Sequence, residues 1–110
     1  MLSKDLVAAS STPLILSILA KEETYGYDII QRIRALSNEQ ILWAEGMLYP
    51  LLHRLEKEGL VAAEWRTTEA GRKRKYYRIN NKGRAALRQE KLQWQVVHDT
   101  LTKLWEVAYV

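Results

Sequence analysis

The most regular hydrophobic pattern in the chain lies between positions 45 and 59. Its four leucines are spaced as one stripe along an α-helix: Leu48, Leu51, Leu52 and Leu55. At about 100° per residue, the opposite side of that helix carries small and polar side chains: Gly46, Pro50, His53 and Lys57. Gly59 is a helix stop signal. The pattern predicts a short helix with one buried face and one exposed face.

Two strands are predicted directly after this helix. Residues 60–66 and 75–80 alternate between apolar and polar positions, which gives each strand an apolar face and a polar face. Residues 67–74 form a charged turn, in which Gly71 supplies the backbone freedom that a tight reversal needs. A helix followed by a hairpin with a basic tip is the order of elements in a winged helix.

The N-terminal part of the chain predicts at least one core helix. Residues 14–20 are so apolar that they must be covered on most sides. The pattern leaves residues 1–11 ambiguous. Ser3 is a cap for a helix that begins near it, and Pro13 either kinks that helix or begins a new one capped by Thr12.

A further helix is predicted over residues 25–36, with Thr24 as its cap. Gly26 in its first turn indicates either close backbone packing or tolerance at a helix end. The connection to the next helix, residues 37–44, contains a short apolar piece that either adds an edge strand or packs under the loop: Ile41, Leu42 and Trp43. Helix, loop and helix together predict a helix-turn-helix.

The last predicted helix begins near Asn80 or Asn81 and carries a heptad seam that is interrupted at Glu90. The seam consists of Leu87, Trp94, Val97, Leu101, Leu104 and Ala108. Roughly 25 helical residues span about 37 Å, more than a domain of this size needs for itself. We therefore expect the end of the helix to project and to pair with a second copy of the chain, with Trp94 and Trp105 in the contact. The alternative is that the seam lies on the chain's own core.

The distribution of charge adds a functional indication. The chain has a net charge of +4, but residues 66–84 contain eight cations against one carboxylate, which places +7 in this segment and leaves −3 elsewhere. A concentrated basic hairpin on a slightly acidic body is typical of a phosphate-binding surface. The alternative is a solvated hairpin whose lysines serve solubility.

Composition excludes several classes of protein. At 110 residues the chain is expected to be a single structural unit, and without Cys, a signal sequence or a long apolar run it is expected to be soluble and cytoplasmic. His53 and His98 fall on different predicted helices, and no nucleophile motif, phosphate loop or metal-ligand cluster is present. We therefore expect no enzymatic activity, no metal and no cofactor.

Three sequence blocks resemble the PadR family of transcriptional regulators: YGYDII at residues 25–30, GMLYPLLHRLEKEGLV at 46–61, and GRKRKYYRIN at 71–80, followed by KGR at 82–84. The similarity covers nearly the whole chain and is closest to the short branch of the family, which has a single C-terminal helix. The resemblance implies a mostly α (α+β) fold, a winged helix-turn-helix over residues 1–80, and a dimerisation helix over residues 81–110.

The resemblance also implies a homodimeric repressor that binds a palindromic operator in double-stranded DNA, with the helix of residues 45–57 in the major groove. The residues at the matching positions are Tyr49, Pro50, His53, Arg54, Lys57, Arg72, Lys73, Arg74 and Lys75. Met47 departs from the family pattern, which usually has Ser or Thr there. Met47 cannot donate to a phosphate, and we expect it to contact a thymine methyl group instead.

Members of the short branch include regulators that bind flat aromatic compounds at the dimer interface. By resemblance, Trp94 lines such an effector site; alternatively, it is only interface core. The expected dimer interface consists of Trp94, Val97, Leu101, Leu104 and Trp105.

Two other functions compete with DNA binding. A winged helix can serve protein–protein contact, but four successive cations in the wing argue against that use. RNA binding would call for exposed aromatic side chains that stack on bases, and Tyr76 is the evident candidate.

Overall fold

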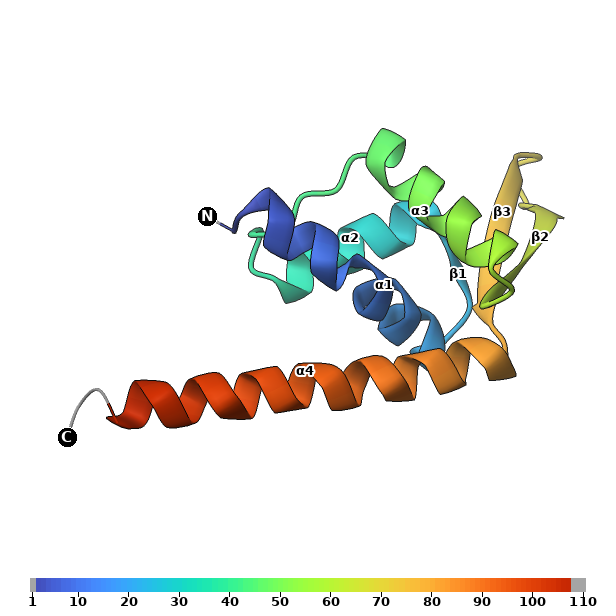
Figure 1. Cartoon of the computed structure of the whole chain (residues 1–110). Coiled ribbons are helices and arrows are strands. Elements are labelled where there is room, and N and C mark those ends of the chain that lie inside the picture. Colours follow the sequence, from blue (N-terminus) through green and yellow to red (C-terminus); the bar gives the residue numbers. More distant parts are fainter. Residues whose placement is uncertain (1, 108–110) are drawn as a thin grey trace.

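The computed structural model describes residues 2–107. The elements follow in the order α1 (Lys4–Lys21), β1 (Thr24–Tyr25), α2 (Gly26–Leu36), α3 (Glu45–Lys57), β2 (Val61–Thr67), β3 (Lys73–Ile79) and α4 (Asn81–Val107). Helices α1, α2 and α3 pack together, the sheet closes one end of them, and α4 runs along one side (Figure 1). The mostly helical α+β winged-helix fold is confirmed.

Helix α1 resolves the ambiguity at the N-terminus. Ser3 caps it by accepting a hydrogen bond from the backbone N–H of Leu6 at 3.1 Å, and Pro13 lies inside the helix. A new helix capped by Thr12 is therefore wrong. The helix continues through Pro13 because the aliphatic side chains of its second half are buried, which outweighs the one hydrogen bond that proline cannot make. The buried aliphatic residues of this half are Ile15, Leu16, Ile18 and Leu19.

The third strand of the sheet comes from a place that the pattern did not indicate. The sheet has the order β1-β3-β2 and is antiparallel throughout, with Thr24 opposite Tyr77. The hydroxyl of Thr24 donates to Oδ2 of Asp28 at 2.6 Å, and Tyr25 occupies the N-cap position of α2 without a side-chain bond. The prediction that Thr24 caps α2 is therefore wrong, because the strand engages this residue.

The α2–α3 connection forms no strand. Trp43 is buried and Ile41 is half-buried beneath the loop, whereas Leu42 is exposed. Of the two alternatives for this apolar piece, packing under the loop is the correct one.

The hairpin of β2 and β3, which we call the wing, reverses at Gly71, whose φ of 81° lies in the left-handed region that suits glycine. Its apolar face is covered only at the base, where Val61, Tyr77 and Ile79 are buried. Farther out, the side chain of Trp65 on the same face is 65% exposed. The core thus ends partway along the wing.

The first turn of α4 is fixed to the end of α3. The Asn80 side chain donates from Nδ2 to the carbonyl of Gly59 at 2.7 Å and accepts at Oδ1 from the backbone N–H of Gly83 at 2.8 Å. Lys82 Nζ donates to the carbonyl of Glu58 at 2.9 Å. A Cβ atom on Gly83 would lie 2.1 Å from the carbonyl oxygen of Leu60, so only glycine fits there.

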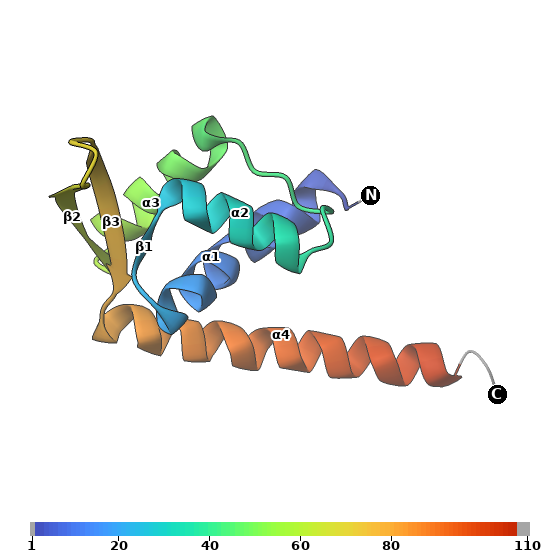
Figure 2. The same ribbon diagram turned by 180° about the vertical axis from the view of Figure 1, so that it is seen from behind.

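The far half of α4 projects from the rest of the molecule, and with α4 included the molecule measures 62 × 29 × 20 Å (Figures 1 and 2). Leu87 is buried against the core and Trp94 is half-buried. Beyond them, between 38% and 61% of the surface of each residue predicted for the dimer interface is exposed: Val97, Leu101, Leu104 and Trp105. Ala108 lies outside the described residues. The predicted seam therefore lies on the chain's own core only at its first position. Among residues 2–107, no helix is both long and apolar enough to cross a membrane.

Candidate nucleic-acid interface

Helix α3 presents the face that its sequence pattern indicates. Leu48, Leu52 and Leu55 are fully buried beneath it. Eight residues on its other sides are exposed: Glu45, Gly46, Met47, Tyr49, Pro50, His53, Arg54 and Lys57. Ala44 at the N-cap makes no side-chain hydrogen bond, so the start of the helix has free backbone N–H groups. An α-helix with a convex polar face of this kind can enter a groove of another molecule.

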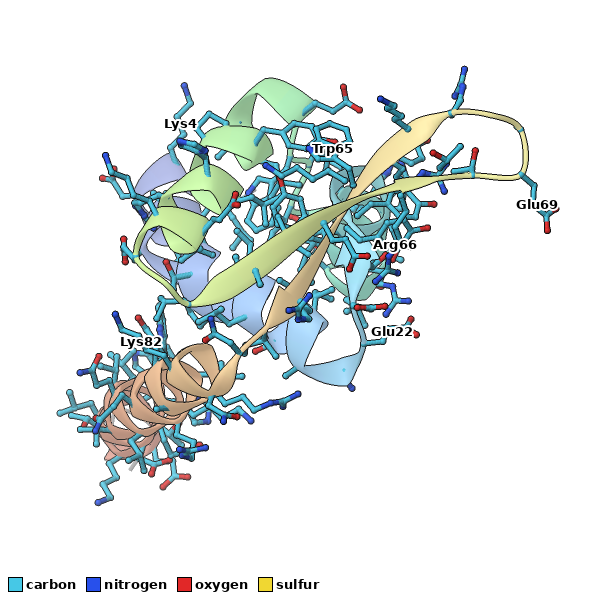
Figure 3. The ribbon with its side chains drawn as sticks, turned by 90° about the vertical axis from the view of Figure 1, so that its right-hand side faces the viewer. Lys4, Glu22, Trp65, Arg66, Glu69 and Lys82 are labelled. Atoms are coloured by element: carbon cyan, nitrogen blue, oxygen red, sulfur yellow. The ribbon has the colours of Figure 1, made fainter. Side chains whose placement is uncertain are left out.

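A groove of about 800 Å³ separates α3 from the wing. Its walls combine aromatic and basic side chains with one carboxylate: Tyr25, Tyr27, Glu45, Tyr49, His53, Trp65, Arg72, Lys73, Arg74, Lys75 and Tyr77. Figure 3 shows Trp65 between α3 and the hairpin, and Glu69 at the hairpin tip. The structure thus brings the exposed face of α3 and the basic wing to one surface, which we call the α3–wing groove.

The four successive cations of the wing have different surroundings. Arg72 and Lys73 are exposed at the end of the hairpin, and within residues 2–107 neither forms an ion pair. Arg74 lies over the ring of Tyr25, with its guanidinium carbon 3.9 Å from the ring centroid. The alternation along β3 places Lys75 on the opposite face from Arg74. Among the described residues, three of the four cations are therefore without an ion pair, and of these Arg72 and Lys73 are exposed whereas Arg74 is held by an aromatic ring.

Lys75 connects the wing to α3. Its Nζ lies 3.3 Å from Oε1 of Glu56 and 5.4 Å from the ring centroid of Tyr77. Burial is the largest single effect and lowers the pKa of Lys75, but the hydrogen bond to Glu56 and the further interactions with Tyr77 and Glu56 together outweigh it, and the pKa is raised overall. Lys75 therefore stays positively charged in the α3–wing groove.

The outer face of the sheet holds a stack of aromatic and cationic groups. Tyr25 and Tyr76 meet edge to face with their centroids 5.5 Å apart, and Arg66 lies 4.5 Å above the ring of Tyr76. Arg66 is held in turn by Glu23 at 2.8 Å and Glu64 at 3.4 Å. These contacts fasten β1 to the wing. They also cover Tyr76, the ring that an RNA-binding function would require.

Four residues predicted for the DNA-binding and effector sites do not line the groove: Pro50, Arg54, Lys57 and Trp94. Arg54 donates to Oγ1 of Thr12 at 3.0 Å and pairs with Glu58 at 3.4 Å. Trp94 belongs to α4 and is separate from the α3–wing groove. Within residues 2–107 no three His, Cys, Asp or Glu side chains are close enough to hold a metal ion.

Trp65 and Glu45 line the groove but were not among the residues predicted for it. The signal for Trp65 was present in the sequence, because the alternation along β2 and β3 pairs Trp65 with Lys75 on one face. For Glu45, which begins α3, no pattern indicated that its carboxylate would face the wing. Its charge, after burial, contributes to raising the pKa of Tyr49.

Comparison with known proteins gives a consistent result. The profile described as "Transcriptional regulator PadR-like family" matches residues 15–89. Transcriptional regulator Rv3488 of Mycobacterium tuberculosis is 40% identical over 77 residues, which are 70% of this chain and 68% of that protein.

Solved structures agree over a longer stretch. A PadR family transcriptional regulator from Eggerthella lenta is 37% identical, with a TM-score of 0.77 over 93% of this chain and 87% of that one. The PadR-like transcriptional regulator BC4206 from Bacillus cereus is 33% identical, with a TM-score of 0.80 over 92% and 96%.

Proposed function

Because the chain belongs to the PadR-like family of transcriptional regulators, we propose that it is a repressor that binds a palindromic operator in duplex DNA as a homodimer. Its family is one of regulators and not of enzymes. The observation that carries the proposal is the α3–wing groove, in which the exposed face of α3 and the cations of the wing share one surface.

In this proposal α3 enters the major groove. An α-helix with its side chains is about 10–12 Å wide, and the major groove of B-DNA is about 12 Å wide. Tyr49, Pro50 and His53 would then face base edges, and Met47 at the start of the helix would meet a thymine methyl group. Lys57 would lie nearer the phosphates, and Arg54 would reach them only by leaving Thr12 and Glu58.

The wing supplies the electrostatic part of binding. Arg72 and Lys73 have no intramolecular charge partner among the described residues, so contact with phosphate replaces only water at these side chains. Arg74 and Lys75 are held against Tyr25 and Glu56 and would bind phosphate from fixed positions. Such contacts are the same for every sequence and position the protein on the duplex.

A second copy of the chain is the proposed partner of α4. The apolar face that is buried at Leu87 continues past the body through four exposed residues, so it is available to another helix of the same kind. A two-fold dimer would present two copies of α3 to two half-sites, which requires a palindromic operator. Trp94 lies where the buried part of this face ends, which supports a wall position for a small aromatic effector at the dimer interface.

Selection of bound sequences from a random duplex pool, with the mass of the complex measured at the same time, tests this function. We expect enrichment of a two-fold symmetric site occupied by two chains. Binding without enrichment, or no binding to duplex DNA, would contradict the proposal and favour a winged helix that contacts another protein.

A further inference from the structure

Gly26 and Tyr49 come from different helices and lie in direct contact. Gly26 is the first residue of α2 and is buried, although it stands at a helix end. A Cβ atom built on it would lie 2.7 Å from Oη of Tyr49 and 2.8 Å from its Cε1 and Cζ. No side chain other than the hydrogen atom of glycine fits beneath the tyrosine ring in its present position.

Space, and not backbone conformation, is what requires glycine here. Among the described residues, the glycines with positive φ are Gly59 and Gly71, so alanine at position 26 would meet no backbone strain. The atoms it would meet belong to the far end of the Tyr49 side chain, which is 40% exposed and can turn away. The structure therefore predicts that alanine displaces the ring and leaves the helices in place.

The ring has a defined environment that this displacement would change. Its hydroxyl end lies against the first turn of α2, while the rest of the side chain faces the α3–wing groove. Burial, followed by the nearby charge of Glu45, raises the pKa of Tyr49 above its ordinary value. A ring turned into solvent would lose the larger of these two effects.

We propose that Gly26 is a positioning residue for operator recognition, because it leaves room for the hydroxyl end of Tyr49 against α2 and so fixes which part of the tyrosine ring faces the DNA. This inference rests on the proposed function of the α3–wing groove. Gly26 itself touches no DNA in the proposal. It acts only through Tyr49, and a change at Gly26 should have no effect on a protein without that ring.

A double-mutant cycle tests this dependence on the enriched operator. We expect Gly26→Ala to weaken binding about 10-fold and to change base preference at the position that Tyr49→Ala affects. Adding Gly26→Ala to Tyr49→Ala should change affinity by less than about twofold. Gln31→Ala is the control, because Gln31 is an exposed residue of the same helix α2 and does not line the α3–wing groove, and this variant should bind as the wild type does.

The titration of Tyr49 gives a second readout that a general loss of folding would not produce. NMR of protein labelled at tyrosine, with the Tyr49 signal assigned from a Tyr49→Phe variant, measures its pKa directly. Gly26→Ala should lower this pKa toward the ordinary value for tyrosine, and Gln31→Ala should leave it where it is. An unchanged pKa in Gly26→Ala would overturn the inference.

Failure of the inference about Gly26 can be distinguished from failure of the proposed function. If Gly26→Ala weakens binding equally with and without the Tyr49 ring, Gly26 acts on the fold, and the inference is wrong while the proposed function stands. If Tyr49→Ala leaves affinity and base preference unchanged, Tyr49 does not read the operator and the inference falls with that assignment. Sequence selection with the wild-type protein still decides in that case whether the chain recognises a symmetric site.

Discussion

Two surfaces at opposite ends of the molecule differ in chemistry. The α3–wing groove is lined by polar, aromatic and cationic groups, with Arg72 and Lys73 free of charge partners among the described residues. The far half of α4 instead presents apolar side chains such as Leu101 and Leu104 to solvent. A surface on which cations outnumber carboxylates suits a polyanion, whereas an apolar helical stripe suits another helix. A chain of this size can therefore present two surfaces that suit partners of different chemistry.

The two surfaces are joined by the first turn of α4, where Asn80, Lys82 and Gly83 contact the end of α3 and the residues after it. This junction sets the direction of α4 relative to the helix that would enter DNA. Substitutions at the junction, at each surface and at one base contact should therefore have separate effects.

The largest effect is expected from Gly83→Ala. The new Cβ would lie 2.1 Å from the Leu60 carbonyl oxygen and 2.7 Å from Cγ1 of Ile79, so backbone must move. We expect the free energy of unfolding to fall by about 3 kcal/mol, and Tm by roughly 12 °C or more, in thermal unfolding at fixed protein concentration.

Gly46→Ala is the control for this change, because its Cβ meets nothing within 4 Å and should leave Tm the same or slightly higher. Equal stability of Gly83→Ala and Gly46→Ala would mean that the junction is not tightly packed.

The next largest effect should follow from Leu101→Asp combined with Leu104→Asp. Each leucine would contribute about 1.5 kcal/mol or more in a helical interface, so the Kd of the dimer should rise at least about 100-fold. Sedimentation of the free protein measures this, and the helical content of the winged domain should remain.

Val96→Asp separates the seam from the rest of α4. Val96 is 65% exposed, yet it lies about 140° around the helix from Leu101. A variant that stays dimeric supports the seam, whereas dissociation of Val96→Asp alone would place the interface on the other side of α4.

A smaller effect, independent of sequence, is expected from Arg72→Ala with Lys73→Ala. Affinity should fall about 10-fold at physiological salt for all duplexes alike, because phosphates carry no sequence information. The slope of log affinity against log salt should become shallower by about 2 for each bound chain.

The matched control removes two exposed cations of α4, Arg88→Ala with Lys103→Ala. Net charge changes equally, so an identical loss of affinity would show that overall charge, and not the wing, attracts DNA.

The smallest effect in total affinity is expected from His53→Ala, which should relax the preference at one base pair in each half-site by about 10-fold. Competition among operators that differ at single positions measures it. His98→Ala, at the other histidine of the chain, should leave every preference unchanged.

Sequence alone could predict the parts of the fold that repeat with a clear period. The leucines of α3 indicated its buried face because 3.6-residue periodicity survives over several turns. β1 has two residues, too few for any alternation, and so the strand that Thr24 begins was read as a helix cap. The sequence also did not show that the core ends before Trp65. Alternation tells which face of a strand is apolar, but not how much of that face is covered.

The groove could be predicted in its components but not in its assembly. The charge pattern indicated the basic wing, helical spacing indicated His53, and the resemblance to the PadR family indicated Tyr49. The contact between Gly26 and Tyr49 joins positions 23 residues apart in sequence through tertiary packing alone. Sequence left open whether Gly26 reflects close packing or tolerance, and the structure decides for close packing.

The separation of the two surfaces can be tested with one variant, Leu101→Asp combined with Leu104→Asp. Its binding is measured on the full enriched operator and on a single half-site. We expect the variant to bind the half-site as the wild-type winged domain does, one chain per duplex, and to lose the additional affinity that the wild type gains on the full palindrome. Loss of half-site binding would show that α4 and the α3–wing groove do not act separately. Undiminished binding to the full site by two chains would show that the dimer does not depend on the seam.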